Sequence, residues 1–207
     1  MAAASGVIIK APNIQTLNVR ITGKAPYMQH RFSKKAEIME KQQAGSTSRG
    51  KKQRDPRDFE KDFRDAMHTS ADGWHGIPAP AIRAALISAC RLVGFQMTKA
   101  KLSVFVEADG VCVADGTPLV RLDAPEPELC TMAVRNETGV VDIRARPLWR
   151  EWAATVRLSY DADQFTGADV VNLLSRAGLQ VGIGEGRPDS KKSAGLGYGL
   201  FVVETAA

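Results

Sequence analysis

Cysteine is scarce in this sequence and does not occur in any pattern typical of metal or disulfide sites. Cys90, Cys112 and Cys130 are odd in number and widely spaced. No Cys-x-x-Cys pair and no His/Cys cluster accompanies them along the chain. We therefore expect no metal site. The interpretation is three reduced, mostly buried thiols, as in a cytoplasmic protein.

Long apolar runs are also missing. No stretch reaches the length of a signal-peptide core or a membrane span, so no membrane partner is expected. With 207 residues, of which 44% are hydrophobic and 25% charged, the chain is long enough to bury a full core. We expect a single domain over residues 1–207, extended by an insertion.

Nucleotide-binding and common catalytic motifs are absent as well. Residues 182–199 read GIGEGRPDSKKSAGLGYG and follow a predicted helix. In dinucleotide and Walker-type loops the glycines instead follow a strand and open a helix, whose N-terminus then faces the phosphate. No Gly-Lys-Ser/Thr closes the loop, and no Ser-His-Asp signature, paired-carboxylate metal motif or kinase motif is present. We expect no cofactor.

Positive charge is plentiful and concentrated in one region. The formal net charge is +5, and residues 24–57 hold ten Lys and Arg against three Asp and Glu. The rest of the chain is slightly acidic, with 18 against 20. Such concentration favours an anionic polymer or surface as partner. The alternative is an ordinary solvated basic loop.

Hydrophobic periodicity predicts an α+β fold. In order, the elements read strand, helix, strands, strands, helix, strand, which is the β-α-β-β-α-β plan of a ferredoxin-like fold. A basic insertion over 34–75 follows the first strand, and its tract 44–57 is predicted to be mobile in the free protein. Strands are expected at 14–23, 101–107, 111–113, 119–122, 131–135, 140–145, 153–160 and 195–203. Helices are expected at 32–43, 59–67, 80–94 and 170–177, with Phe59 and Phe63 packing inward.

Two motifs carry a resemblance to a known group. Residues 76–86 read GIPAPAIRAAL, and with the glycine-rich loop at 182–199 they resemble the RAMP superfamily. This RRM-like group includes RNA-binding backbone subunits and repeat-processing nucleases of CRISPR systems. Ala79 and Pro80 stand where those subunits tend to have Gly and Ser, and Arg83-Ala84 replaces a Lys-Gly pair. The turn APYMQHRFS at 25–33 is similar to one in uncharacterised phage and prophage proteins.

The resemblance implies an RRM/RAMP-like domain with a thumb-like insertion that binds nucleic acid in the cytoplasm, which is the host cytoplasm if the protein is phage-encoded. CRISPR backbone subunits stack along their RNA, so a homo-oligomer or filament is expected by analogy. Two further functions remain open. One is a metal-independent endoribonuclease with His30 as general acid or base. The other is a phage protein that mimics a CRISPR subunit. The sequence does not distinguish RNA from DNA.

The residues themselves also favour a single-stranded nucleic acid. Lysine and arginine contact phosphates, and aromatic rings stack on unpaired bases. The predicted binding residues are Tyr27, His30, Arg31, Phe32, Lys34, Lys35, Arg49, Lys51, Lys52, Arg54, Gly182, Gly184, Gly186, Arg187, Lys191, Lys192, Gly195 and Gly197. The glycines either allow tight packing or leave room for an incoming backbone, and we expect the second at Gly184. Trp149 and Trp152 belong either to a second binding patch or to the core.

Overall fold

A four-stranded antiparallel sheet forms the centre of the protein. The computed structural model describes residues 9–31, 58–135, 141–190 and 195–204. Strand β1 (Ile14–Gly23) pairs along its length with β9 (Ala153–Asp161), with Val19 opposite Val156. Strand β10 (Phe201–Val203) pairs with the other side of β1, and β4 (Val104–Glu107) pairs with β9. The strand order is therefore β10-β1-β9-β4.

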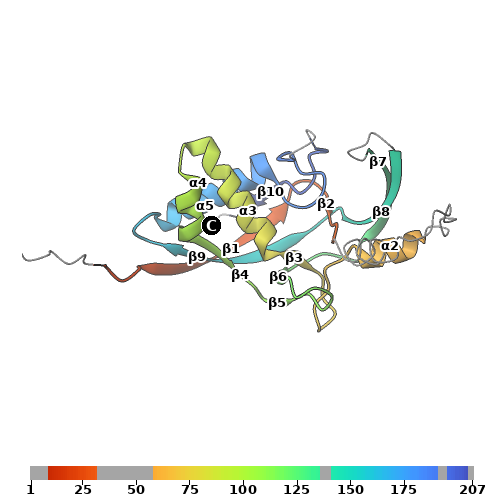
Figure 1. Ribbon diagram of the computed structural model, residues 1–207, viewed down its shortest axis with the longest axis horizontal. Coiled ribbons are helices and arrows are strands. Elements are labelled where there is room, and N and C mark those ends of the chain that lie inside the picture. The colour runs from red at the N-terminus through yellow and green to blue at the C-terminus, as the bar shows by residue number, and fades with distance from the viewer. Residues whose placement is uncertain (1–8, 32–57, 136–140, 191–194, 205–207) are drawn as a thin grey trace, which may run out of the picture.

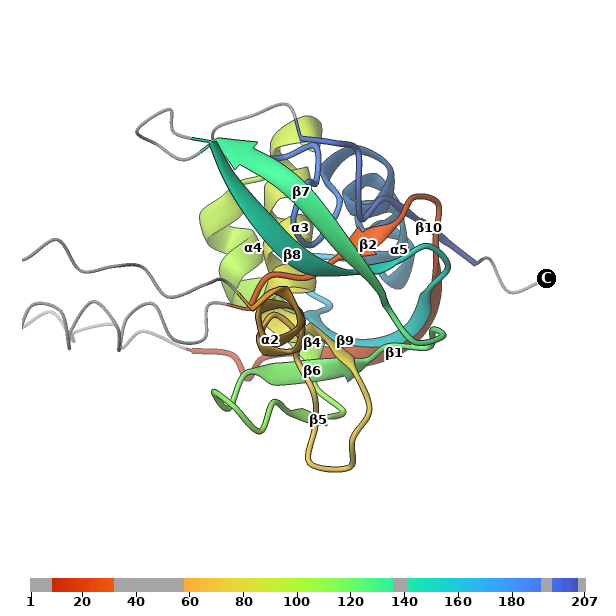
Figure 2. The same cartoon turned by 90° about the vertical axis from the view of Figure 1, so that its right-hand side faces the viewer.

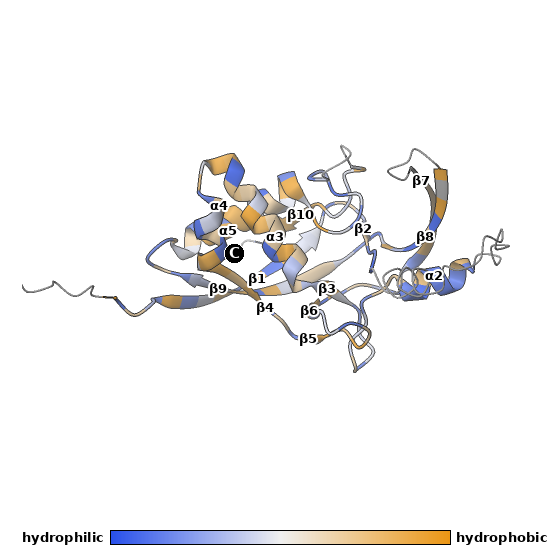
Figure 3. Ribbon diagram, viewed as in Figure 1, coloured by the Kyte–Doolittle hydropathy of each residue, from blue (hydrophilic) through white to orange (hydrophobic). Residues whose placement is uncertain are grey.

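Alternation of side chains explains which face of this sheet is buried. In β9, Ala154, Val156, Leu158 and Tyr160 are all buried, while the residues between them are more exposed. A strand that buries every second residue turns one face toward the core. Helices cover that face, and apolar residues gather between the helices and the sheet (Figure 1 and Figure 3).

Two helices supply most of this cover. Helix α3 (Ala79–Ala89) has Pro80 in its first turn, where the missing N–H costs nothing, and buries Ile82 and Leu86. The 3-10 turn η1 (Cys90–Val93) continues it and ends at Gly94, which adopts a left-handed conformation. Helix α5 (Gly167–Arg176) begins with a reciprocal capping box between Thr166 and Asp169. It continues into the π-helical turn η2 (Ala177–Val181), and the short α4 (Met97–Ser103) lies beside α3.

Two smaller sheets extend the core. Strands β2 (Tyr27–Met28), β8 (Val141–Trp149) and β7 (Glu128–Arg135) form one, in that order. Strands β3 (Gly76–Pro78), β6 (Pro118–Arg121) and β5 (Gly110–Val111) form the other. The β7–β8 hairpin curves away from the four-stranded sheet, and α2 (Phe59–Asp65) lies against β8 (Figure 1 and Figure 2).

The α+β class is confirmed, but several predicted elements differ from the structure. The strand expected at 101–107 begins only at Val104, because the preceding residues complete α4. The strand expected at 195–203 covers only 201–203, because Gly195, Gly197 and Gly199 all have positive φ, which is incompatible with a strand. The strand expected at 111–113 is the two-residue β5.

The predicted insertion at 34–75 is described only from residue 58 onward, and the expected helix 32–43 and mobile tract 44–57 lie outside the described residues. Helix α2 forms as predicted but buries none of its residues. Phe59 is 36% exposed, so the expected inward packing of this side chain was wrong. Among the described residues, no helix is both long and apolar enough to cross a membrane.

Candidate functional site

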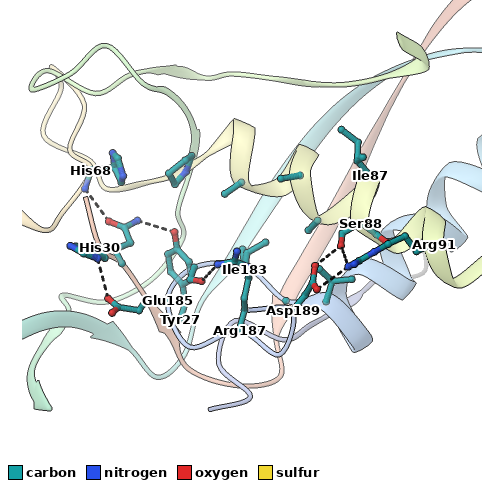
Figure 4. Close-up of a pocket in the computed structure, with 18 of the residues that line it drawn as sticks. Tyr27, His30, His68, Ile87, Ser88, Arg91, Ile183, Glu185, Arg187 and Asp189 are labelled. Carbon is teal, nitrogen blue, oxygen red and sulfur yellow. Dashed lines mark hydrogen bonds and ion pairs between the residues drawn. The ribbon is translucent and has the colours of Figure 1, made fainter. Parts of the chain in front are cut away.

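A groove of about 700 Å³ lies between α3 and the glycine-rich loop (Figure 4). Helix α3 lines one side with Ala81, Ala84, Ala85 and Ser88. These positions recur with helical spacing, so they share one face of the helix, and their small side chains leave the groove open. The segment from Val181 to Asp189 lines the opposite side.

Backbone hydrogen bonds fix the shape of the loop side. The amide of Glu185 donates to the Met28 carbonyl at 2.9 Å, and the amide of Gly199 donates to the Pro26 carbonyl at 2.7 Å. Within the loop, the Ile183 amide donates to the Gly199 carbonyl at 3.0 Å. The loop is thus attached to the turn between β1 and β2, which brings two distant parts of the sequence to one site.

Gly184 and Gly197 differ in their surroundings although both have positive φ, at 79° and 75°. A Cβ at Gly184 would lie 2.5 Å from the Met28 carbonyl oxygen and 2.7 Å from Cε2 of Tyr27. Gly184 therefore serves close packing, and the prediction that it leaves room for a ligand was wrong. A Cβ at Gly197 would meet no atom within 4 Å. Backbone or proline atoms also crowd the Cβ positions of Gly182, Gly195 and Gly199, while side chains of Leu196 and Tyr198 lie near that of Gly186.

At one end of the groove, the carboxylate of Glu185 faces an imidazole and a guanidinium group. Nδ1 of His30 lies 3.7 Å from Oε2 of Glu185. The guanidinium Nε of Arg146 donates to the same oxygen at 2.7 Å, and Arg146 is only 6% exposed. Arg187 donates from Nη1 to the Gly184 carbonyl at 3.0 Å. His30 and Arg146 thus face the same Glu185 oxygen, and the hydrogen bond from Arg146 fixes the position of that carboxylate.

At the other end, Asp189 bridges the loop to α3 (Figure 4). Its carboxylate accepts hydrogen bonds from Ser88 Oγ and from Arg91 Nη2, the latter at 2.8 Å. The hydrogen bond from Ser88 and the one from Arg91 hold the pKa of Asp189 below its usual value. Lys101 also lines the groove. The lining therefore contains the cations Arg91, Lys101 and Arg187, and both of its acids are engaged in ion pairs.

Tyr27 was predicted to stack on bases, but its ring lies in the core and is 1% exposed. The ring centroids of Trp149 and Trp152 lie 5.7 Å and 5.3 Å away. Burial also raises the pKa of the Tyr27 hydroxyl. Both tryptophans are buried, which identifies them as core residues and excludes a second exposed patch built on them.

The other predicted contacts fall into three groups. The Nε of Arg31 donates to the Met67 carbonyl at 2.9 Å, which gives this side chain a structural partner. His30 and Arg187 line the groove with Gly182 and Gly184. The remaining predicted side chains lie outside the described residues: Phe32, Lys34, Lys35, Arg49, Lys51, Lys52, Arg54, Lys191 and Lys192.

Positive charge is divided unevenly between the described residues and the rest of the chain. The described residues contain 18 Lys and Arg against 19 Asp and Glu. The other ten Lys and Arg all belong to residues 32–57 and 191–194. The excess positive charge of the protein therefore resides in these two segments and not in the described fold.

Sequence reasoning missed a cluster beside the groove. One ring nitrogen of His68, Sγ of Cys112 and a carboxylate oxygen of Asp115 lie within 4.8 Å of one another. No His/Cys cluster accompanies the cysteines in the sequence, but the fold brings a histidine close to Cys112, so the expectation of no such cluster was wrong. His68 and Cys112 belong to segments joined by pairing of Ser70 with Cys112, a contact that spacing in the sequence does not reveal.

The environment of the cluster affects both titrating partners. Burial lowers the pKa of His68, because the charged imidazolium loses its hydration. For Asp115, partial burial acts to raise the pKa. Hydrogen bonds from Thr117 and Cys112, together with the nearby His68, outweigh it and hold the pKa below its usual value. Neutral imidazole beside an ionised carboxylate is therefore the favoured state near neutral pH.

Compared with models of known protein families and with curated proteins, the chain matches none.

Proposed function

We propose that the central domain is a ferredoxin-like core. In chain order its elements are β1, α3, β4, β9, α5 and β10, which is a β-α-β-β-α-β sequence. In the sheet, β10 lies beside β1, β1 beside β9, and β9 beside β4. If the four strands are numbered along the chain, this order is 4-1-3-2, and all neighbouring strands are antiparallel. Two helices on one face complete this plan. The other strands are then insertions: β2 and β3 lie between β1 and α3, and β5 to β8 lie between β4 and β9.

The function that we infer on this core is binding of single-stranded nucleic acid in the groove between α3 and the glycine-rich loop. One observation carries the proposal: the groove lies where both basic segments join the described fold. His30 lines it two residues before segment 32–57, and Asp189 lines it two residues before segment 191–194. Ten Lys and Arg are thus tethered to a groove that an extended chain could occupy.

The division of charge predicts how binding occurs. The described fold is close to neutral, so the tethered lysines and arginines supply the attraction to phosphates. Tyr27 is buried and offers no stacking face to a base. Recognition that rests on phosphates carries little sequence information. We therefore expect weak preference among sequences, and the groove volume suits a short single strand better than a duplex.

Fluorescence anisotropy with labelled single-stranded RNA, single-stranded DNA and duplex DNA tests this function. We expect both single strands to bind, with affinity falling steeply as salt rises. Replacing Lys191 and Lys192 together by Ala should reduce the slope of log affinity against log salt by about 1.4, from about 0.7 per lost phosphate contact. No binding to any strand at low salt would reject the proposal and favour a protein-interaction module.

His30 supports a second candidate, a metal-independent endoribonuclease. Its imidazole lines the groove with Nδ1 3.7 Å from Oε2 of Glu185, so a carboxylate lies next to the candidate general acid or base. Labelled RNA incubated with protein in EDTA tests this candidate. Cleavage that disappears in His30→Gln, with binding retained, would establish it. Intact RNA would leave binding as the function.

Light scattering with and without a long strand tests the expected assembly of several copies.

A further inference from the structure

The cluster of His68, Cys112 and Asp115 combines three different metal-binding groups in one place. Cys112 and Asp115 are three residues apart in a single tight turn. In that turn the Gly116 amide donates to the Cys112 carbonyl and the Cys112 amide donates to the Thr117 carbonyl, both at 2.8 Å. The turn thus presents a thiol and a carboxyl group in the manner of a short chelating loop.

A second segment brings the histidine to this turn. Ser70 pairs with Cys112, and the Val113 amide donates to the Thr69 carbonyl at 3.0 Å. His68 is held from its other side, because its amide donates to Oε1 of Gln29 at 2.9 Å and its carbonyl accepts from the Gly76 amide at 3.0 Å. The backbone on both sides of the cluster is therefore fixed by hydrogen bonds.

Two polar atoms at this junction have unmet hydrogen-bonding capacity. His68 is 8% exposed, and its Nδ1 has no hydrogen-bond partner within the part of the chain that the structure describes. The hydroxyl of Ser70, a residue only 5% exposed, is in the same condition. A buried polar atom without a partner in the protein is costly, so a water molecule or an ion is needed to satisfy it. The imidazole nitrogen is a common metal ligand in its neutral form.

We propose that His68, Cys112 and Asp115 bind one divalent cation of borderline softness, with Zn²⁺ as the best match. The donor set of nitrogen, thiolate sulfur and carboxylate oxygen matches the ligands that zinc takes. At zinc bond lengths, tetrahedral ligand atoms lie about 3.3 to 3.8 Å apart. Since the three atoms lie within 4.8 Å of one another, they need to approach by at most about 1.5 Å. The Cys112 thiol releases its proton to solvent on binding.

The site is open to solvent on one side, and its three ligands leave one coordination position free. Cys112 and His68 are buried, whereas Asp115 is exposed, so the ion enters from the Asp115 side. Three protein ligands leave the fourth tetrahedral position to water or to a ligand. His68 also lines the groove, so the site lies at its edge. The inference does not depend on nucleic-acid binding.

The test uses the full chain, stripped of metal with EDTA and dialysed. Calorimetric titration with Zn²⁺ should give one ion per chain, and titration with Co²⁺ should give a thiolate charge-transfer absorption. Asp115→Asn should weaken Zn²⁺ binding by more than about tenfold, and Cys112→Ser should remove the cobalt–thiolate absorption. The matched control is Cys130→Ser, a free and half-buried thiol in β7, which should leave both signals unchanged.

Two results would overturn the proposal: no Zn²⁺ binding to the parent chain, or an equal thiolate absorption with and without Cys112. If Cys112→Ser proves unfolded by circular dichroism, Asp115→Asn decides the matter, because this exposed carboxylate can be changed without touching the core. Unchanged Zn²⁺ affinity in the folded Asp115→Asn variant would then reject the site.

Discussion

The two sides of the groove are built on opposite principles. On the α3 side, apolar side chains such as Ile82 and Leu86 are buried against the sheet, and small residues face outward. On the loop side, backbone carbonyls and amides pack against one another, and the absence of a Cβ allows it. The first side is held by burial of side chains, and the second by close backbone contact together with the buried side chain of Ile183. Substitutions should therefore act differently on the two sides.

The largest loss of stability should come from the inner face of α3. Leu86 is fully buried in the core, so Leu86→Ala leaves a cavity and should lower the free energy of unfolding by about 2 to 5 kcal/mol. Urea denaturation measures this change. The exposed Ala84 on the same helix is the control, and Ala84→Ser should be close to neutral. Equal effects at the two positions would contradict the assignment of an inner and an outer face.

A smaller loss is expected on the loop side, and it should differ between two glycines. Gly184→Ala and Gly197→Ala both place a side chain at positive φ, at a cost of roughly 1 to 2 kcal/mol. Gly184→Ala in addition forces a Cβ against Met28 and Tyr27, whereas Gly197→Ala meets open space. Thermal unfolding should therefore rank Gly184→Ala as the more damaging. The reverse ranking would mean that the loop packs differently from the structure.

The smallest effect concerns the bridge between the two sides. Asp189→Asn weakens the contacts with Ser88 and Arg91, which are partly exposed, so the loss at neutral pH should stay below about 1 kcal/mol. The pKa of Asp189 is lowered in the folded state, with Arg187 also acting in that direction. Its contribution is thus present above the ordinary Asp value of about 4 and is lost as pH falls below it.

Urea titrations of Asp189→Asn from neutral to acidic pH check this sign. The difference from the parent chain should shrink as the pH falls. A double-mutant cycle with Arg91→Gln isolates the ion pair from the Ser88 hydrogen bond. A difference that grows toward acid would contradict the lowered pKa.

Sequence patterns predicted the sheet and its covering helices well, because burial of alternate or helically spaced residues leaves a direct signature. The alternation around Val156 and Leu158 in β9 is an example. The segment GLGYG at 195–199 also alternates, yet it is not a strand. A glycine pattern does not reveal the sign of φ, and the contacts of this segment lie within the loop and, at Gly199, with Pro26 of the β1–β2 turn.

The candidate site was predicted only in part. The loop residues and His30 could be found from composition and local charge. The α3 side could have been found from the spacing of Ala81, Ala84, Ala85 and Ser88, which predicts one small-residue face. Two further features were beyond the sequence. Burial of Tyr27 depends on tryptophans more than a hundred residues away. The proximity of His68 to Cys112 joins two segments whose spacing along the chain matches no known metal-binding motif.

The most direct measurement of the central claim compares two added charges. Ala84→Glu places a carboxylate in the groove at an exposed position of α3, and Asn172→Glu places the same group at an exposed position of α5 outside the groove lining. Both variants should match the parent in melting temperature. Anisotropy with a labelled single strand at low salt should then give affinity reduced about tenfold or more by Ala84→Glu and nearly unchanged by Asn172→Glu. Equal affinities for the two folded variants would show that nucleic acid does not occupy the groove.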